Sequence, residues 1–182
     1  MTTHQLRILQ NNLHKSQERT ESILNDPDIE PFAILMLQEQ YWSAYTKSSP
    51  IHPSWTLVEP TATNDIQPRS VIYVNKYLLP ASQISPLKLP FSDVSAITIT
   101  TMTNTKPHLI INVYNPCDKS IIPELHENLR NTINTQDYDL IIIGGDFNTH
   151  HPLWNPKEYT RHDEDADTLV NMMMELYNIY QY

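Results

Sequence analysis

The chain has 182 residues, of which 40% are hydrophobic, so it is long enough for one domain with a sizeable core and too apolar to be disordered. Its one cysteine, Cys117, excludes an internal disulfide framework and a cysteine-based zinc site, and indicates an intracellular, reducing compartment. The formal net charge of −9 argues against tight non-specific binding to nucleic acid, but it is compatible with a metal-dependent enzyme, whose site must itself be acidic.

The first part of the chain predicts two strands joined by a short helix. Residues 6–12 are typical of a strand that leaves the core at a polar end, and Ser16 is suited to cap a helix that ends before Asp26. Residues 32–37 form a continuous apolar run of strand length, which indicates burial on both faces. This run is far shorter than the ~18 residues of a membrane helix, and the polar start of the chain shows no signal peptide.

The middle of the chain predicts further strands between proline-rich loops. Strands are expected at 55–58 and 71–74, followed by an irregular segment at 76–92. Residues 96–101 alternate between apolar and polar, which indicates a half-exposed strand, and residues 109–114 predict another. The short polar link between these two strands favours an antiparallel hairpin.

The last part of the chain predicts a helix on each side of a strand. Apolar residues at helical spacing over 122–133 indicate a surface helix, capped by Ser120 or Asp118. Residues 140–143 are typical of a buried strand, and the methionines and leucines of 169–180 predict a last helix that packs on the core. The expected class is therefore α/β, with two sheets packed face to face and helices outside, in a single domain over residues 1–182.

Polar side chains stand at or just past the ends of several predicted strands. They are Asn12, Glu39, Tyr114 and the pair Asp146 and Asn148. Carboxylate and amide oxygens are hard ligands that suit Mg²⁺, and a phenol can donate a hydrogen bond to a phosphate. In an extended segment Asp146 and Asn148 would point the same way, so that one holds a water and the other a phosphate oxygen.

Each of these residues also has a simpler structural explanation when it is taken alone. Asparagine and aspartate are common turn formers after a strand, a glutamate is often a solvated strand end, and a tyrosine is often a half-buried aromatic. The functional interpretation therefore depends on the ordered set. Gly144 and Gly145, the only glycines of the chain, directly precede Asp146 and allow backbones to approach closely there.

Four segments, in their order along the chain, carry a family resemblance. They are LRILQNN at 6–12, LMLQE at 35–39, VYNP at 113–116 and IIIGGDFN at 141–148, the last followed by HHPLW at 150–154. Together they resemble the endonuclease/exonuclease/phosphatase superfamily, and within it the apurinic-type endonuclease domain of non-LTR (LINE-type) retrotransposons. The resemblance implies a two-sheet α/β sandwich of this type, and IIIGGDFN is its most specific segment.

The resemblance implies a role for each residue of the set. Glu39 would be the main Mg²⁺ ligand, with Asn12 beside it, and Mn²⁺ could replace Mg²⁺. Asp146 would orient or deprotonate the attacking water, while Asn148 and Tyr114 would hold the scissile phosphate. The reaction would be an in-line attack of water on a phosphodiester, by which an endonuclease of a non-LTR retrotransposon nicks its target DNA.

Other positions fit the resemblance less closely. His150 and His151 are candidate DNA contacts, but packing near Trp154 explains them at least as well. His14 stands where related enzymes often carry an acid. Family members also continue with a strand that bears an aspartate and with a terminal Ser-Asp-His segment, and nothing after Asn148 matches either one.

The resemblance therefore implies a domain that lacks its last strands, whose first strand has an unpaired edge and whose activity is weak or absent. Two alternatives stay open at this point. One is a degenerate, non-catalytic remnant that acts at most as a binding module, and the other is a phosphatase of a small phosphoester. We expect DNA as the partner, no membrane, and an intracellular location for which the nucleus is a candidate; the oligomeric state is left open.

Overall fold

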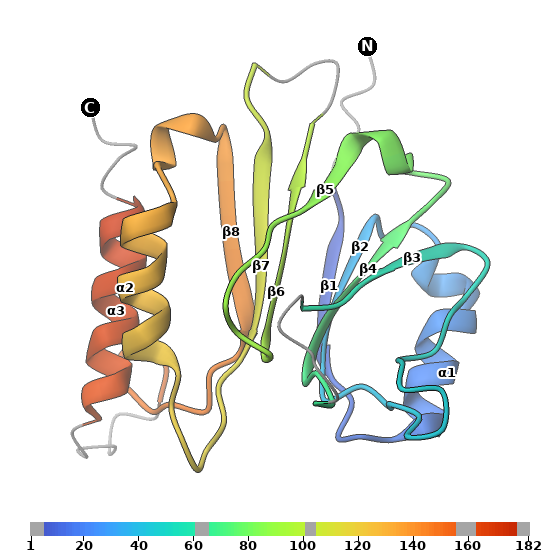
Figure 1. Cartoon of the computed structure of the whole chain (residues 1–182), viewed down its shortest axis with the longest axis horizontal. Coiled ribbons are helices and arrows are strands. Elements are labelled where there is room, and N and C mark those ends of the chain that lie inside the picture. Colours follow the sequence, from blue (N-terminus) through green and yellow to red (C-terminus); the bar gives the residue numbers. More distant parts are fainter. Residues whose placement is uncertain (1–5, 61–65, 101–104, 156–162, 178–182) are drawn as a thin grey trace.

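The computed structural model of the chain describes residues 6–60, 66–100, 105–155 and 163–177, which contain two four-stranded sheets packed face to face (Figure 1). The first sheet has the order β1 (Ile8–Asn12), β2 (Ile34–Gln38), β4 (Ser70–Asn75) and β3 (Trp55–Val58). β1 pairs parallel with β2, whereas β4 runs antiparallel to both β2 and β3. β2 and β4 are buried at every residue because they lie in the middle of the sheet, which confirms the burial predicted for the apolar run at 32–37.

The second sheet has the order β5 (Ile84–Pro86), β6 (Val94–Ile99), β7 (His108–Tyr114) and β8 (Leu140–Asp146). β6 and β7 form the predicted antiparallel pair, and β8 joins β7 in parallel. The prediction of an irregular segment at 76–92 was wrong for β5, a three-residue edge strand that ends in a proline, which an edge tolerates. The half-exposed strand predicted at 96–101 is confirmed only in part: Thr98 is partly exposed and Thr100 exposed, with Ile97 and Ile99 buried, but Ala96 and the start of β6 are buried as well.

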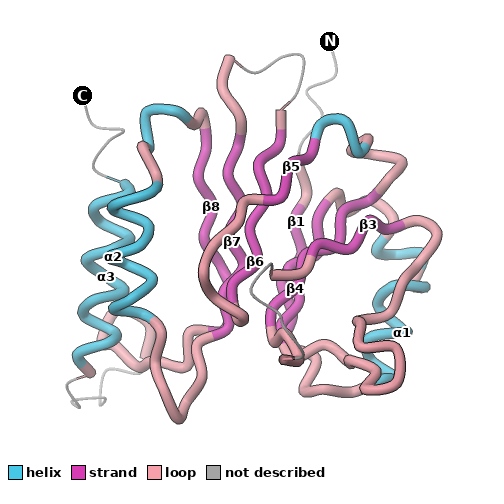
Figure 2. The backbone as a smooth tube through the Cα atoms, in the orientation of Figure 1, coloured by secondary structure: helices cyan, strands magenta, loops and turns pink. Residues whose placement is uncertain are grey.

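The burial of β6 follows from its place between two apolar clusters. Val94 and Ala96 pack into the cluster that the second sheet shares with the helices α2 (Ile122–Thr132) and α3 (Glu164–Tyr177). Ile97 and Ile99 pack on the opposite side, against residues of the first sheet. Figure 2 shows the resulting layers, in which α2 and α3 lie outside the second sheet and α1 (Gln17–Asn25) lies outside the first.

α1 and α2 begin and end close to the predicted positions, whereas α3 begins at Glu164, five residues before the segment predicted at 169–180. Ser16 caps α1, because its side chain accepts a hydrogen bond from the backbone N–H of Arg19 at 3.2 Å. The capping predicted for α2 is confirmed in part: the Ser120 hydroxyl accepts a hydrogen bond from the backbone N–H of Ile122 at 3.3 Å, although Ile121 holds the N-cap position and Asp118 takes no part. The end of the helix predicted at 169–180 lies outside the described residues. Within those residues, no helix combines the length and apolar character needed to cross a membrane.

β1 and β8 each lie at an edge of their sheet as the described residues define it. The unpaired edge expected for the first strand is therefore present. β8 differs from the buried strand predicted at 140–143, because only β7 pairs with it and its residues are partly exposed, with Leu140 at 37%. The carboxyl ends of both edge strands lie at the end of the sandwich where the polar residues of the candidate site gather.

Candidate active site

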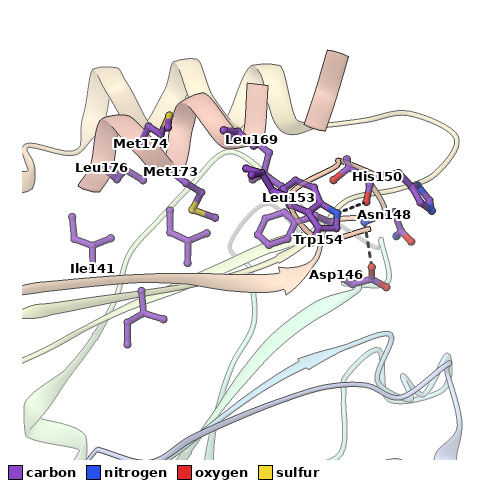
Figure 3. Close-up of a pocket in the computed structure, with 15 residues that line it drawn as sticks. Ile141, Asp146, Asn148, His150, Leu153, Trp154, Leu169, Met173, Met174 and Leu176 are labelled. Atoms are coloured by element: carbon purple, nitrogen blue, oxygen red, sulfur yellow. Dashed lines mark hydrogen bonds between the residues drawn. The ribbon is translucent and has the colours of Figure 1, made fainter. Parts of the chain in front are cut away.

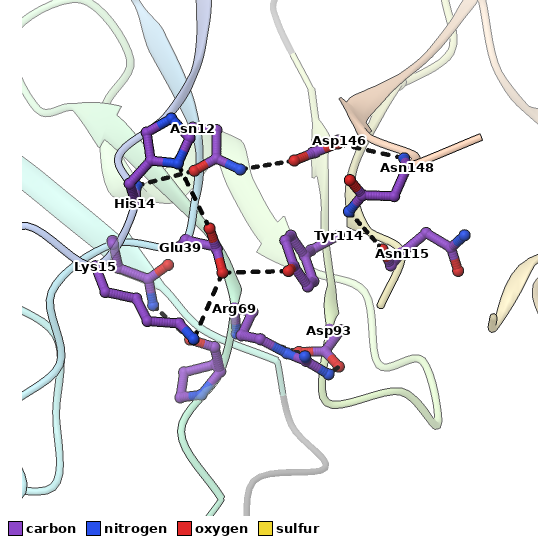
Figure 4. Close-up of polar contacts among 12 residues, drawn as sticks. Asn12, His14, Lys15, Glu39, Arg69, Asp93, Tyr114, Asn115, Asp146 and Asn148 are labelled. Carbon is purple, nitrogen blue, oxygen red and sulfur yellow. Dashed lines mark hydrogen bonds and ion pairs between the residues drawn. The ribbon is translucent and has the colours of Figure 1, made fainter. Parts of the chain in front are cut away.

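The ends of four strands bring the predicted site residues together across the two sheets (Figure 4). Asn12 closes β1 and donates a hydrogen bond from Nδ2 to Asp146 Oδ2, at the end of β8, over 2.6 Å. The Tyr114 hydroxyl, at the end of β7, donates to Glu39 Oε1, just past β2, over 3.1 Å. Each of these hydrogen bonds joins one sheet to the other. The structure thus brings these four residues of the predicted set together, and their chemical roles stay a prediction.

Glu39 is held in an uncommon backbone conformation. Its φ is 46°, and the facing residues His14 and Lys15 have φ values of 51° and 58°. All three lie in the left-handed region, which residues other than glycine seldom adopt. The Glu39 backbone N–H donates to Arg69 O at 2.9 Å, and the Lys15 backbone N–H donates to Glu39 O at 2.6 Å. Backbone strain that the surroundings maintain in this way is concentrated at functional sites.

The Glu39 carboxylate faces Lys15 and His14 as well as Tyr114. Lys15 Nζ lies 3.6 Å from Oε1, and His14 Nδ1 lies 3.9 Å from Oε2. The Glu39 side chain is only 15% exposed, whereas those of His14 and Lys15 are 67% and 59% exposed. The carboxylate is therefore largely buried, and the exposed side chains of His14 and Lys15 stand between it and the solvent.

Asp146 is fixed from both sides. Asn12 holds Oδ2, and the backbone N–H of Asn148 donates to Oδ1 at 3.3 Å. The chain can reach this position because residue 145 is a glycine. Its φ is +144°, and a Cβ there would lie 1.9 Å from the carbonyl oxygen of Val113. A Cβ on Gly144 would lie 3.1 Å from Met36 Cε, in the interface between the sheets. The close backbone approach predicted from the two glycines is confirmed at Gly145, whereas the neighbour of Gly144 is a side chain.

Asn148 lies beside Asp146 in a different way from that predicted. Its φ of 48° turns the chain directly after β8, so Asp146 and Asn148 do not project from one extended segment. The side-chain amide of Asn148 donates to the backbone oxygen of Asn115 at 2.7 Å, which ties the turn to the end of β7. The prediction of parallel side chains was wrong because it assumed that the strand continues to residue 148.

Tyr114 keeps its proton under ordinary conditions. Burial, together with the negative charge of Glu39 and the hydrogen bond to it, raises the pKa of the Tyr114 phenol to about 12. The positive charge of Arg69 acts in the opposite direction, with its guanidinium 4.8 Å from the centroid of the Tyr114 ring. At neutral pH the phenol is thus a hydrogen-bond donor, which is the form that a phosphate oxygen requires.

Arg69 and Asp93 are parts of this arrangement that the sequence did not indicate. Arg69 Nη2 and Nε donate to Asp93 Oδ2 and Oδ1 at 2.6 and 3.0 Å, next to Tyr114 (Figure 4). Both residues stand just before a strand begins, in segments without a recognisable motif. No periodicity or spacing connects them, and only the packing of the two sheets brings them together.

The two histidines behind β8 differ in their surroundings. His151 Nε2 lies 3.3 Å from Asp167 Oδ1, and His151 Nδ1 accepts a hydrogen bond from the Leu153 backbone N–H. The centroid of its ring lies 5.0 Å from that of Trp154. These contacts favour the packing role that was the alternative to a DNA contact. His150 is exposed, and its backbone N–H donates to Asp163 Oδ2 at 3.1 Å.

A groove of about 1020 Å³ borders the site along the free edge of β8 (Figure 3). Its lining is mainly apolar and comes from β8, the segment behind it and α3, with Ile141, Trp154 and Met173 among the contributors. Asp146 and Asn148 stand at one end of it. The groove therefore lies beside the candidate site, and its apolar side chains provide none of the polar groups of that site.

The donor set fits a hard divalent cation. Glu39 and Asp146 offer carboxylate oxygens and Asn12 an amide oxygen, and oxygen ligands of this kind suit Mg²⁺ or Mn²⁺. In the described part of the chain, no three His, Cys, Asp or Glu side chains converge as a metal cluster. A cation at Glu39 and Asn12 would therefore have few protein ligands and would keep most of its waters.

Comparisons with known proteins agree with this description. Residues 108–181 match a family model described as endonuclease-reverse transcriptase (Exo_endo_phos_2). The structure is similar to the endonuclease domain of TRAS1, a telomere-specific non-LTR retrotransposon, with a TM-score of 0.68 and 21% identity over 94% of this chain and 71% of that chain. No curated protein sequence matches the chain.

Two further solved structures share the architecture at lower similarity. SmcL has a TM-score of 0.51 and 15% identity over 92% of this chain and 68% of that chain. Humanized D. rerio TDP2 has a TM-score of 0.50 and 15% identity over 82% of this chain and 65% of that chain. The predicted fold, an α/β sandwich of the endonuclease/exonuclease/phosphatase type, is confirmed, and so is the resemblance to the endonuclease domain of non-LTR retrotransposons.

Proposed function

We propose that the chain is a divalent-metal-dependent DNA endonuclease domain of the non-LTR retrotransposon type, which hydrolyses a phosphodiester bond of its target. The observation that carries the proposal is the joining of Asn12 to Asp146 and of Tyr114 to Glu39 at one end of the sandwich. This places two carboxylates, an amide and a protonated phenol in one site. The family match over residues 108–181 supports it, since it spans Tyr114, Asp146 and Asn148.

The residues of the site divide the work of hydrolysis. Glu39 and Asn12 would hold Mg²⁺ or Mn²⁺, which when bound supplies positive charge to the scissile phosphate and the leaving oxygen. Asp146 orients the attacking water and accepts its proton, and its carboxylate is held in place by Asn12 and by the Asn148 backbone. Orientation before substrate binding is what makes a general base of this kind effective.

Tyr114 and Asn148 would hold the phosphate. The Tyr114 hydroxyl donates to Glu39 Oε1, and its pKa of about 12 in this position means that it carries a proton which a phosphate oxygen would accept. Asn148 stands exposed on the other side of Asp146, where its amide is close to the ends of β7 and β8. Donors fixed in this way stabilise the charge that develops on the phosphate during the attack.

DNA is the proposed substrate although the chain is acidic. The ammonium group of Lys15 stands 3.6 Å from Glu39, so one exposed positive side chain lies at the mouth of the site although the net charge is −9. A positive group beside the site, together with the divalent cation that the site would hold, attracts a phosphate backbone. An intracellular, reducing setting suits the exposed thiol of Cys117, and the nucleus is where such an enzyme would meet its target.

We expect these 182 residues to nick DNA slowly when they are tested alone. They contain no Ser-Asp-His segment, which the family resemblance associates with the phosphate site. Removal of one preorganised group of this kind lowers the rate by ~10²–10³. A polypeptide that adds a family-like segment with the strand-borne aspartate and Ser-Asp-His should nick faster.

The test is a plasmid-nicking assay in Mg²⁺ with the 182-residue chain and the extended polypeptide, each with Glu39→Gln. Glu18→Gln, on the exposed face of α1, is the matched control. We expect the extension to accelerate nicking, Glu39→Gln to remove it, and Glu18→Gln to leave it unchanged. Hydrolysis of a small phosphoester without DNA nicking would identify a phosphatase, and DNA binding without any Mg²⁺-dependent hydrolysis in either polypeptide would identify a binding module.

A further inference from the structure

We propose that Arg69 and Asp93 form a positioning pair that holds Tyr114 against Glu39 and thereby sets the phosphate-binding geometry of the site. The inference rests on the proposed function, because it assigns a task to Tyr114 within it. It concerns two residues that lie outside the predicted set and that no motif of the chain marks.

The pair is rigid. Arg69 donates to both carboxylate oxygens of Asp93, from Nη2 at 2.6 Å and from Nε at 3.0 Å, and its backbone N–H donates to Oδ1 at 3.2 Å. A planar guanidinium bound to a carboxylate in this bidentate way has one defined orientation. The Asp93 side chain is only 7% exposed and that of Arg69 30%, so solvent weakens the pair little. The hydrogen bond to Asp93 is also the main reason that the pKa of Arg69 is raised.

The pair joins the two sheets directly beneath the site. Arg69 precedes β4 of the first sheet and Asp93 precedes β6 of the second. The Glu39 backbone N–H donates to the carbonyl of Arg69, and the Tyr114 backbone N–H donates to the carbonyl of Asp93, both at 2.9 Å. With the bond from Tyr114 to Glu39, these contacts close a ring of four residues across the interface.

The guanidinium also controls the Tyr114 side chain itself. It lies 4.8 Å from the ring centroid, within the distance at which a cation is attracted to an aromatic face. This contact fixes the ring from one face and leaves the hydroxyl group directed at Glu39 (Figure 4). Because Asp93 occupies the Nε and Nη2 donors of Arg69, the guanidinium is directed toward the protein, and its effect on a phosphate would pass through Tyr114.

Kinetics distinguish a positioning residue from a direct phosphate contact. In the nicking assay, Arg69→Gln should lower kcat on the order of tenfold with little change in the KM for DNA. The double variant with Tyr114→Phe should lose no more kcat than the more impaired of the two single variants. Arg69→Lys keeps the positive charge but not the bidentate geometry, so it should restore little of the rate. Losses that multiply, with a raised KM, would show that Arg69 binds the phosphate itself.

A spectroscopic cycle on the 182-residue chain tests the pair without any activity. With ¹³C-labelled tyrosine and the Tyr114 signal assigned through Tyr114→Phe, Glu39→Gln should shift the Tyr114 Cζ resonance because it changes the hydrogen-bond acceptor. In an Arg69→Lys or Asp93→Asn background the same change should shift it much less, whereas in an Arg19→Gln background, an exposed arginine of α1, the full shift should persist. An equal shift of the Tyr114 Cζ resonance in all backgrounds would overturn the positioning pair. If the unsubstituted chain does not nick DNA, that result would count against the proposed function alone.

Discussion

The side-chain amide of Asn12 donates to a carboxylate oxygen of Asp146 at 2.6 Å, although the two residues are 134 positions apart in the sequence. The bond connects β1 to β8, which are edge strands of different sheets within the described residues. It therefore fixes the spacing of the sheets at the point where the proposed metal ligand and the proposed base meet. Several consequences for stability and chemistry can be measured.

Removal of the Asn12 side chain should destabilise the fold. Asn12→Ala leaves the partly buried Asp146 carboxylate without one of its two donors, and hydrogen bonds to charged groups contribute ~1.5–3 kcal/mol. Since the site is partly open to solvent, we expect a loss of about 1.5 kcal/mol in the free energy of unfolding, measured with urea. Asn11→Ala, at an exposed position of the same strand, is the control and should change it by less than ~0.5 kcal/mol.

The two adjacent glycines should respond very differently to the same substitution. Gly145→Ala would place a Cβ 1.9 Å from a backbone oxygen at a φ of +144°, so the β7–β8 pairing must shift and Asp146 with it. We expect a loss of about 3 kcal/mol in the free energy of unfolding. Gly144→Ala meets only the flexible end of Met36, at 3.1 Å, and should cost about 1 kcal/mol. Equal losses in the two variants would contradict the close approach at Gly145.

Metal binding should depend on Glu39. Mn²⁺ should bind weakly to the chain, because a site of few oxygen ligands leaves the ion largely hydrated, and Glu39→Gln should abolish the binding. Paramagnetic broadening of NMR signals around the site during a Mn²⁺ titration measures it. Glu18→Gln serves as the control and should bind like the parent chain. Unchanged broadening in Glu39→Gln would remove Glu39 from the ligand set.

Tyr114 should also affect how the free energy of unfolding changes at alkaline pH. The pKa of its phenol is about 12 in the folded chain against an ordinary value of 10.0, so the unfolded chain loses this proton first as the pH rises. The stabilisation is fully present below pH 10 and is lost as the pH rises toward about 12. The free energy of unfolding should therefore fall less steeply over this range in Tyr114→Phe than in Tyr45→Phe, where the tyrosine is 98% exposed. Parallel curves would contradict the buried contact with Glu39.

Much of the site was predictable because of how its strands end. The apolar runs at 32–37 and 140–143 define strands by local pattern alone, and Glu39 and Asp146 follow them directly, so strand geometry places both at an end of the sandwich. The turn at Asn148 was not predictable in the same way. Its left-handed φ accompanies a hydrogen bond from its side chain to the backbone oxygen of Asn115, which directly follows β7.

The parts of the fold that were missed depend on partners distant in sequence. The burial at the start of β6 was missed because Ser95, just before the segment predicted at 96–101, is polar; its hydroxyl lies 3.0 Å from that of Ser70 in the interface between the sheets, where both are buried. Polar groups satisfied by one another look solvent-exposed in a sequence pattern. Arg69 and Asp93 were missed for the same reason, since only the packing of the sheets shows that their charges meet.

The most direct test of the proposed hydrolytic site is the Mg²⁺-dependent nicking rate of Asp146→Asn in the extended polypeptide. The substitution keeps the shape of the side chain but removes the base, so nicking should fall by ~10²–10⁴, the range expected for loss of a positioned general base. Asp28→Asn, at an exposed position after α1, should nick at the rate of the parent. Nicking by Asp146→Asn at the parent rate would contradict the account, because the residue on which the two sheets converge would then have no part in the reaction.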